Sequence, residues 1–292
     1  MQTSVRLQSF ELSSRDIADV DVGLLHALSI GVGWPHRAHD WDMLREAGKG
    51  IVAVDGIGRV FGTAMWFPHG ETFATIGMVI TSPRTQAQGN GRWLMEQIME
   101  RCGDRDLALN ATRPAVNLYL SLGFNTEATV FQCQGDAANE IPLAPAIEGE
   151  VVPLAHADFD AVEALDGRAF GAGRVRTLMI LAREASILGI RRNGRIEAYA
   201  FCRKFGRGHV IGPIVASNDA DAINLVAAHL KTLKGAFARV DTRENNGAFV
   251  TFLQACGLSV FDTVTTMSKG RPFLNRKTDE PWVYGLSVQA LS

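Results

Sequence analysis

The chain has 292 residues, which is enough for two ordinary domains. Apolar residues make up 47% and charged residues 21%, as in soluble globular proteins and unlike disordered or collagen-like chains. Lysine and arginine total 29 against 31 acidic residues, so the net charge of −2 supplies no positive field for nucleic acid or an anionic membrane. Because no leader peptide or long apolar run is recognisable, we expect a cytoplasmic protein with no nucleic-acid and no membrane partner.

Cysteine and histidine spacing gives no support for a metal site. The four cysteines contain no CxxC pair, so we expect reduced, partly buried thiols; they are Cys102, Cys133, Cys202 and Cys256. His36 and His39 lie beside Asp40 and Asp42 at a spacing that can place ligands on one helical face. No further ligand cluster accompanies them, and we therefore expect no metal.

The first half alternates helical and strand patterns. In residues 13–50, Ser13, Ser14 and Asp16 can cap a first helix, which residues 31–35 break before a second, shorter helix. The elements expected next are a β-hairpin over 51–67, a strand over 72–81, a helix over 92–102, a strand over 107–111 and a helix over 114–123.

The middle of the chain has the composition of a linker. Pro142, Pro145 and Pro153 flank the acidic Glu148 and Glu150. We place a domain boundary near residue 145, which gives domains over 1–145 and 146–292.

The second half contains short matches to the first, in the same order. Three pairs recur at offsets of 136, 135 and 134 residues: GRVFGTA (58–64) with GRIEAYA (194–200), IGMVI (76–80) with IGPIV (211–215), and LGF (122–124) with CGL (256–258). The nearly constant offset favours a duplication, and chance similarity among apolar strands is the alternative.

The segment with the clearest chemical signal is QAQGNG, residues 86–91, between an expected strand and an expected helix. Such a turn leaves unpaired backbone N–H groups at the positive end of a helix dipole, where a pyrophosphate can bind. Gly89 and Gly91 leave no Cβ in the path of the phosphates. The turn alone is also compatible with a simple tight connection.

Its context resembles the acetyl-CoA site of the GNAT superfamily of N-acyltransferases. The pattern Q-x-x-G-x-G is followed by a helix, a strand and A-V-N-L-Y-L-S-L-G-F, whose family positions are filled by Ala115, Leu118, Tyr119, Gly123 and Phe124. The likeness covers residues 7–134, and neither GxGxxG nor a P-loop is present. It implies an α/β (α+β) fold with two tandem GNAT-like domains, each a mixed, splayed central sheet flanked by helices.

The resemblance also implies how acetyl-CoA, as co-substrate, would bind. The backbones of Val79, Ile80 and Thr81 would pair with the pantetheine arm as an added strand. The pyrophosphate would contact Gln86, Ala87, Gln88, Gly89, Asn90, Gly91 and Arg92. Arg92 either reaches a phosphate or is solvated. Asn117 is a further candidate contact, since Thr112 stands where many relatives have an asparagine.

Tyr119 is the candidate general acid, because in the family the tyrosine of this signature often protonates the departing CoA thiolate. The alternative is a core tyrosine that packs the helix on the sheet. Glu71, His36 or a chain of water molecules can serve as the base. Trp34, His36, Arg37 and Trp41 in the loop over 31–41 either contact the acceptor or close the domain by packing.

The second half resembles a degenerate copy. The offset of 135 pairs Gly89 with Asn224 and Gly91 with Val226, and the offset of 134 pairs Tyr119 with Leu253. Asp219 and Asp221 would repel phosphates there, so we expect one CoA per chain. Four conspicuous residues either face an acceptor pocket or support the fold, and they are Asp166, Arg174, Tyr199 and Arg203.

The function expected from this resemblance is transfer of an acetyl group from acetyl-CoA to the amine of a small-molecule acceptor, with a homodimer allowed. A non-enzymatic CoA-binding sensor is the alternative. An aminoacyl transferase that uses charged tRNA is disfavoured, because no basic stripe is evident.

Overall fold

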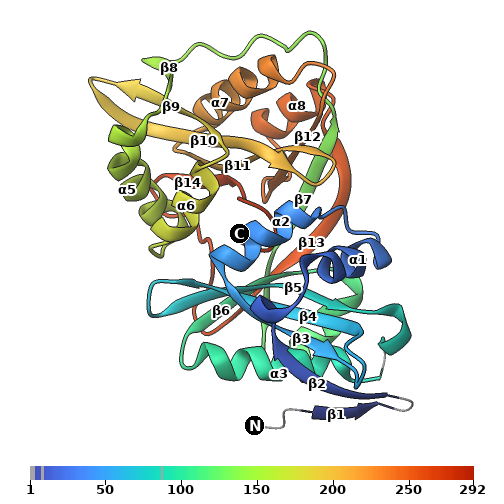
Figure 1. Ribbon diagram of the computed structural model, residues 1–292. Coiled ribbons are helices and arrows are strands. Elements are labelled where there is room, and N and C mark those ends of the chain that lie inside the picture. Colours follow the sequence, from blue (N-terminus) through green and yellow to red (C-terminus); the bar gives the residue numbers. More distant parts are fainter. Residues whose placement is uncertain (1–3, 8–9, 87) are drawn as a thin grey trace.

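The computed structural model describes residues 4–7, 10–86 and 88–292, which form two halves with the same order of elements apart from one additional strand at the start of the first half and one at the end of the second (Figure 1). The first half runs β1 (Ser4–Leu7), β2 (Phe10–Asp16), α1 (Val22–Gly31), α2 (Ala38–Ala47), β3 (Lys49–Val54), β4 (Val60–His69), β5 (Phe73–Thr81), α3 (Asn90–Cys102), β6 (Asp106–Ala111), α4 (Val116–Ser121) and β7 (Asn125–Asp136). The second half runs β8 (Glu150–Pro153), α5 (Phe159–Phe170), α6 (Val175–Ala182), β9 (Ser186–Arg192), β10 (Arg195–Phe205), β11 (Gly208–Ala216), α7 (Asp219–Thr232), β12 (Phe237–Thr242), α8 (Ala248–Ala255), β13 (Ser259–Lys269) and β14 (Trp282–Gly285).

The strands join into one mixed sheet that continues through both halves. Their order is β1-β2-β3-β4-β5-β6-β13-β7-β12-β11-β10-β9-β8, and β14 pairs with β11 off this path. The two halves therefore share backbone hydrogen bonds as well as side-chain contacts.

The halves exchange their last long strands. β13 of the second half lies between β6 and β7, and it pairs with β6 from Thr265 opposite Ala111 to Lys269 opposite Leu107. β7 of the first half pairs with β12 over its later residues, with Asp136 opposite Phe237 and Phe131 opposite Thr242. Figure 1 shows β7 and β13 running side by side from one half to the other. Each half thus completes the sheet of the other.

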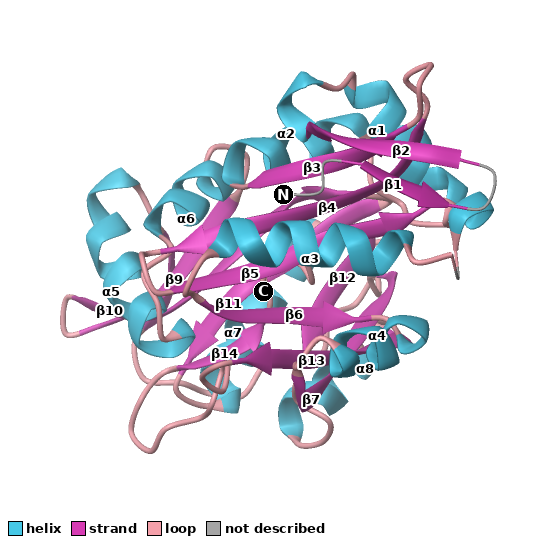
Figure 2. Ribbon diagram, turned by 90° about the horizontal axis from the view of Figure 1, so that it is seen from below, coloured by secondary structure: helices cyan, strands magenta, loops and turns pink. Residues whose placement is uncertain are grey.

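Helices cover the sheet in layers. α3 contacts β3, β4 and β5 on the outer face of the first half, as Figure 2 shows, and α7 contacts β9, β10 and β11 in the second. Between the halves, one apolar core combines residues of both, including Leu25, Phe67, Phe170, Phe201 and Leu286. None of the helices in the described ranges is long and apolar enough to cross a membrane.

The sequence prediction for residues 13–21 is wrong. Ser13 and Ser14 lie in β2, where Ser13 pairs with Val54 of β3, because ladder hydrogen bonds and the burial of Leu12 outweigh their capping preference. Asp16 ends β2 and caps only a short 3-10 helix over Ile17–Asp19, where its side chain accepts from the N–H of Ala18 at 2.8 Å. α1 begins later, and the side chain of Asp21 accepts its capping hydrogen bond from the N–H of Gly23 at 2.8 Å.

The later elements of the first half agree with their sequence patterns. The hairpin is β3 and β4, the next strand is β5, and the predicted helices correspond to α3 and α4. All four cysteines are free and buried, as predicted. The repeated order of elements in the second half confirms the predicted duplication.

One prediction concerns acid stability. His229 lies on the buried face of α7, its Nε2 is 3.1 Å from the carbonyl oxygen of Ala200, and burial lowers its pKa to about 4. In the unfolded chain a histidine pKa is about 6.5, so between pH 6.5 and pH 4 the unfolded chain binds a proton at this residue and the folded chain does not. The contribution of His229 to the free energy of unfolding is fully present above pH 6.5 and is lost as the pH falls to 4. Its size is on the order of 3 kcal/mol.

We expect His229→Gln, which keeps a donor but cannot titrate here, to show a smaller fall in Tm between pH 7 and pH 4.5 than the unaltered chain. Thermal unfolding followed by circular dichroism measures this difference. His156→Gln, at an exposed position, is the matched control and should retain the original slope. The same acid slope in His229→Gln would contradict the prediction.

Candidate active site

The sheet of the first half opens between β5 and β6. These parallel strands pair only from Phe73 opposite Asp106 to Ile76 opposite Leu109. β5 continues to Thr81 with β4 on one side, while β6 continues beside β13. The edge of β5 over residues 77–81 therefore faces an opening, as expected from the resemblance.

A β-bulge marks the start of this open edge. The register between β4 and β5 shifts between Thr63 opposite Ile80 and Met65 opposite Gly77, and Met78 has a φ of +52°. Positive φ is uncommon for a residue with a Cβ, and here the hydroxyl of Thr63 donates to the carbonyl oxygen of Met78 at 2.7 Å. The bulge lies just before Val79, Ile80 and Thr81.

The loop after β5 is fixed by its own polar side chains. Gln86 donates to the carbonyl oxygen of Thr81 at 3.1 Å, and Gln88 donates to that of Arg84 at 3.1 Å. The buried Asn90 donates to the carbonyl oxygen of Phe61 at 3.2 Å. These hydrogen bonds position the loop through the amide N–H groups, and the side-chain oxygens of Gln88 and Asn90 have no partner among the described residues. Ala87 lies outside the described residues.

The start of α3 presents a cluster of main-chain N–H groups. Gly89 precedes the helix with a φ of +91°, and the first helical hydrogen bond runs from the N–H of Trp93 to the carbonyl of Gly89 at 3.0 Å. The N–H groups of Asn90, Gly91 and Arg92 therefore have no carbonyl of their own helix to bond. Together with the helix dipole, they form a favourable position for an anion.

The beginning of α3, the end of β5 and α4 meet at Gly91. A Cβ at Gly91 would lie 3.4 Å from a methyl carbon of Leu118 and 3.6 Å from that of Thr81. The structure thus brings the predicted pantetheine-binding and pyrophosphate-binding segments together. The side chain of Arg92 extends toward Ser121 and donates to its hydroxyl at 2.6 Å.

Tyr119 follows Leu118 on α4 and is buried. Its ring meets that of Phe124 edge to face at 6.0 Å, and burial raises the pKa of its hydroxyl above the usual range. The hydroxyl therefore keeps its proton at neutral pH. Asn117 is exposed on the same helix.

The corresponding region of the second half is closed by the chain itself. β11 and β12 pair only at His209 and Val210, and beyond that point β14 pairs with β11, with Ile214 opposite Gly285. The N–H of Leu286 then donates to the carbonyl of Asp241 in β12 at 2.8 Å. β14 thus fills the opening that remains free between β5 and β6 beyond the bulge.

The mapping of Gly89 onto Asn224 and of Gly91 onto Val226 is wrong. The helix that corresponds to α3 is α7, and its N-cap is Asn218, because the connection from β11 to α7 is shorter than that from β5 to α3. The first turn of α7 carries Asp219 and Asp221, and Asp221 forms an ion pair with Arg192 at 2.5 Å. The first turn of α7 therefore carries two carboxylates, whereas the first turn of α3 carries none and presents its main-chain N–H groups.

The pairing of Tyr119 with Leu253 is confirmed by the main chain. Phe124 N–H donates to the carbonyl of Tyr119 at 3.1 Å, and Leu258 N–H donates to that of Leu253 at 2.9 Å. The second half has no hydroxyl at this position.

A cavity of about 170 Å³ lies where the halves meet, next to the bulge of β5. The first half contributes Gly77, Met78 and Asn110, together with the loop over 33–36. The second half contributes residues of β10, β12 and β13 and the segment 288–290. A ligand in this cavity would lie beside the start of the open edge.

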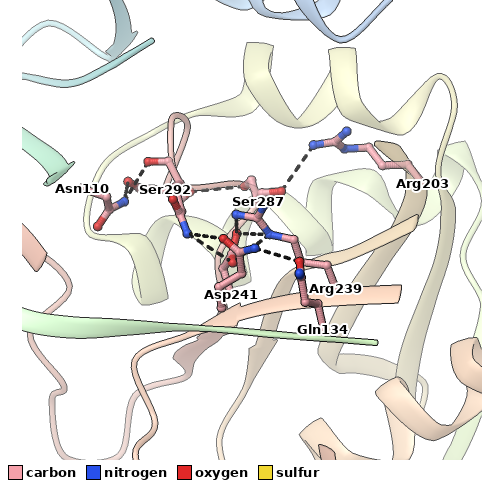
Figure 3. A network of polar contacts seen from close by, with 9 residues as sticks. Asn110, Gln134, Arg203, Arg239, Asp241, Ser287 and Ser292 are labelled. Atoms are coloured by element: carbon pink, nitrogen blue, oxygen red, sulfur yellow. Dashed lines mark hydrogen bonds and ion pairs between the residues drawn. The ribbon is translucent and has the colours of Figure 1, made fainter. Parts of the chain in front are cut away.

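Residues 288–290 form one wall of this cavity, and the segment 287–292 contacts β5 and β6 where their pairing ends. A Cβ on Gly77 would lie only 2.7 Å from that of Ala290, so glycine is required for this approach. Asn110 donates to the carbonyl of Gln289 at 2.8 Å and to the hydroxyl of Ser292 at 3.0 Å (Figure 3).

A buried polar network holds this segment in place. Arg174 donates twice to Asp166 at 2.8 Å, and it also donates to the hydroxyl of Ser287 at 3.1 Å and to the main-chain oxygen of Ser292. The hydroxyl of Tyr199 donates to Asp166. Arg203 donates to the carbonyl of Ser287 at 3.3 Å. These contacts favour support of the fold over direct contact with an acceptor.

For the loop over 31–41 the alternatives were contact with the acceptor and packing that closes the domain, and its residues differ in this respect. Trp34 and His36 line the cavity. Trp41 is fully buried and donates to the hydroxyl of Ser29 at 2.9 Å, so it packs the domain. Arg37 is exposed at the N-cap of α2, where its N–H donates to Asp40 at 2.7 Å.

Sequence reasoning missed the residues that the second half brings to the cavity, above all Arg239 and Asp262, and it also missed Asn110. An asparagine inside the apolar strand over 107–111 is a weak signal of a polar role. The sequence carries no comparable signal for Arg239 or Asp262, because the exchange of strands alone brings them to the first half.

Comparison with known families agrees with this architecture. Residues 46–126 and residues 162–285 each match a family model described as an acetyltransferase (GNAT) domain. The two matches cover most of the chain and fall in separate halves. The chain belongs to the GNAT superfamily. It is a tandem GNAT protein. The GNAT family uses acetyl-CoA as co-substrate.

Solved structures show the same tandem GNAT fold at low sequence identity, while no curated protein matches the sequence. A protein from Pyrococcus horikoshii, described as a proposed acetyltransferase, has a TM-score of 0.80 and 19% identity over 100% of this chain and 99% of its own. A tandem GNAT protein from the clavulanic acid biosynthesis pathway has a TM-score of 0.64 and 18% identity over 91% and 99%. A GCN5-related N-acetyltransferase from Sphaerobacter thermophilus has a TM-score of 0.61 and 15% identity over 92% and 97%.

The first half of this GNAT protein fits acetyl-CoA by its chemistry. The open edge of β5 offers main-chain donors and acceptors that match the amides of a pantetheine arm. The N–H groups at the start of α3 match a pyrophosphate. Within the ranges that the structure describes, no group of three or more side chains could hold a metal ion.

A charge placed at Gly91 tests the position of the pyrophosphate. A Cβ there makes only ordinary contacts, so Gly91→Gln and Gly91→Glu should both fold, and they differ by one negative charge. We expect Gly91→Glu to abolish CoA binding, whereas Gly91→Gln weakens it less, because only the carboxylate repels the phosphates. Isothermal titration with CoA measures both. Equal affinities of the two variants would show that the pyrophosphate binds elsewhere.

Proposed function

We propose that this protein transfers an acetyl group from acetyl-CoA to the amine of a small-molecule acceptor at the opening of the first half. The observation that carries the proposal is the open edge of β5, which lies between the N-terminus of α3 and the cavity shared by both halves. A donor bound along the edge and an acceptor bound in the cavity would meet at the bulge.

Main-chain groups do most of the binding in this proposal. Val79, Ile80 and Thr81 pair with the pantetheine arm, and residues 86–92 hold the pyrophosphate, with Arg92 limited by its bond to Ser121. Asn117, exposed on α4, remains a candidate contact. Acetyl-CoA supplies an activated thioester, so the acceptor amine attacks its carbonyl directly without a covalent enzyme intermediate.

Tyr119 donates the proton to the departing thiolate in this mechanism, since its hydroxyl is protonated and α4 borders the opening. Glu71 lies in the turn before β5, at the opposite end of that strand from the bulge. His36 has its pKa lowered to about 3 by burial and by the nearby Arg239, which makes it a poor base at neutral pH. A water chain is therefore the favoured route for the amine proton.

Replacing Tyr119 by Phe tests the acid role while keeping the ring contact with Phe124. We expect kcat to fall by ~10²–10⁴ and the Kd of CoA to change less than a few fold, because only the proton donor is removed. Thiol release under saturating substrates gives kcat. Tyr284→Phe, which removes a hydroxyl bonded to Asp219 in the second half at 2.9 Å, is the matched control and should leave kcat unchanged. An unaltered kcat in Tyr119→Phe would remove this residue from the acid role.

The stoichiometry of CoA binding tests the assignment of function to the first half. We expect one CoA per chain, because β14 occupies the second opening and Asp219 and Asp221 stand at the start of α7. Isothermal titration of the full chain counts the sites. Gly91→Glu serves as the control, and it should reduce the count to zero. Two sites, or residual binding of one CoA by Gly91→Glu, would contradict the proposal.

An acceptor screen separates the enzyme from a CoA-binding sensor. Purified protein is mixed with acetyl-CoA and pooled small amines, and free thiol is measured over time. Acceptor-dependent thiol release supports acetyl transfer. Tight CoA binding with no release above hydrolysis across all pools would favour the sensor.

A further inference from the structure

The charges in the cavity between the halves give information about the acceptor. Apart from the buried His36, whose low pKa leaves it neutral, the lining has one cationic side chain, Arg239, and one anionic side chain, Asp262, among the described residues. Both belong to the second half, although the cavity reaches the bulge of β5 at Gly77 and Met78. A ligand that complements both charges carries a negative group for Arg239 and a positive group for Asp262, and is therefore zwitterionic.

Two nitrogens of the Arg239 guanidinium are hydrogen-bonded to Asp241, and the third has no partner among the described residues. Its Nε donates to Asp241 at 2.9 Å and its Nη2 donates to the same carboxylate at 2.8 Å, while Nη1 makes no hydrogen bond to the described residues. Figure 3 shows Arg239 against Asp241. Because Asp241 is fully buried and bonded to two nitrogens of the guanidinium, the pair is held in one orientation. A donor that is already oriented loses little entropy when it binds a carboxylate.

Asp262 is exposed at the rim of the cavity. One of its oxygens accepts only from the N–H of the adjacent Thr263, at 2.7 Å, and no cationic side chain of the described residues pairs with it. Its carboxylate can therefore attract an ammonium group on entry.

The remaining wall is partly aromatic. Trp34, Phe205 and Phe261 line it, and Phe261 is 69% exposed. A cavity of about 150 Å³ in another protein holds a benzene molecule, so the volume of about 170 Å³ here suits a small organic molecule. A neighbouring cavity of about 150 Å³ shares Arg239, Phe205 and Phe261, and it leaves room for a longer side chain.

We propose that the acceptor is a free amino acid whose carboxylate binds Nη1 of Arg239 while its amine faces the bulge of β5. This inference rests on the proposed acetyl transfer for the fate of the amine, but the binding site is independent of it. A carboxylate is favoured over a phosphate, because Asp241 and Asp262 repel a dianion more strongly than a single charge. The second half, with its own opening closed, thus sets the specificity of the first.

The test uses the full chain with each of the twenty amino acids and with the corresponding amino-acid amides, which lack the carboxylate charge. We expect at least one amino acid to be acetylated with a kcat/KM ~10- to 100-fold above that of its amide, the range of one charge-assisted hydrogen bond. Calorimetric binding to the CoA-loaded protein should show the same preference without any turnover.

Arg239→Gln should abolish this preference, mainly through KM, while CoA binding is retained. Because that variant leaves the buried Asp241 unpaired, Arg239→Gln with Asp241→Asn is measured beside it and should show the same loss with better folding. Arg195→Gln, at an exposed position of β10 that lines neither cavity, is the matched control, and the preference should persist.

Several outcomes overturn the inference. They are no binding of any amino acid, equal use of amides, tighter binding of the aminophosphonate analogue of the preferred amino acid, or an unchanged preference in the double variant. Amino-acid binding that depends on Arg239 without any thiol release would instead uphold this site and overturn the proposed acetyl transfer.

Discussion

The exchange of β7 and β13 is the constraint on which the rest of the molecule depends. In the first half, β6 borders the opening on one side, and its other neighbour is β13, which comes from far along the chain. Because β7 pairs with β12, Arg239 and Asp241 come to lie beside the first half. The cavity, its charges and its position at the bulge all follow from this pairing.

The two halves show how one fold can keep its packing while it changes its chemistry. In the first half the gap between β5 and β6 stays open beyond the bulge, whereas in the second half β14 pairs with β11 at the corresponding place. Strand pairing and core packing do not require an open edge, so the second half keeps the fold with its edge covered. It retains a supporting role through the Asp166, Arg174 and Tyr199 network.

The sequence was sufficient for what depends on local patterns, and insufficient for what depends on distant pairing. Periodicity and glycines located α3, α4 and the strands around them, and the QAQGNG motif located the start of α3. Capping preference failed at Ser13 and Ser14, where β3 provides stronger partners. A constant offset misplaced Gly89 onto Asn224, since two copies of a fold differ in loop length. Arg239 and Asp262 carry no local signal, because their role arises from strand exchange.

The same exchange has a consequence for the order in which the chain is made. During synthesis the edge of β6 emerges with no partner, and β13 follows almost 150 residues later. At about 5–20 residues per second, this interval is roughly seven to thirty seconds. An unpaired strand edge invites pairing with other chains, so the nascent protein passes through a vulnerable period that ends only when its last long strand is inserted. Translation speed over the second half therefore bears on how much of the first half reaches its native sheet.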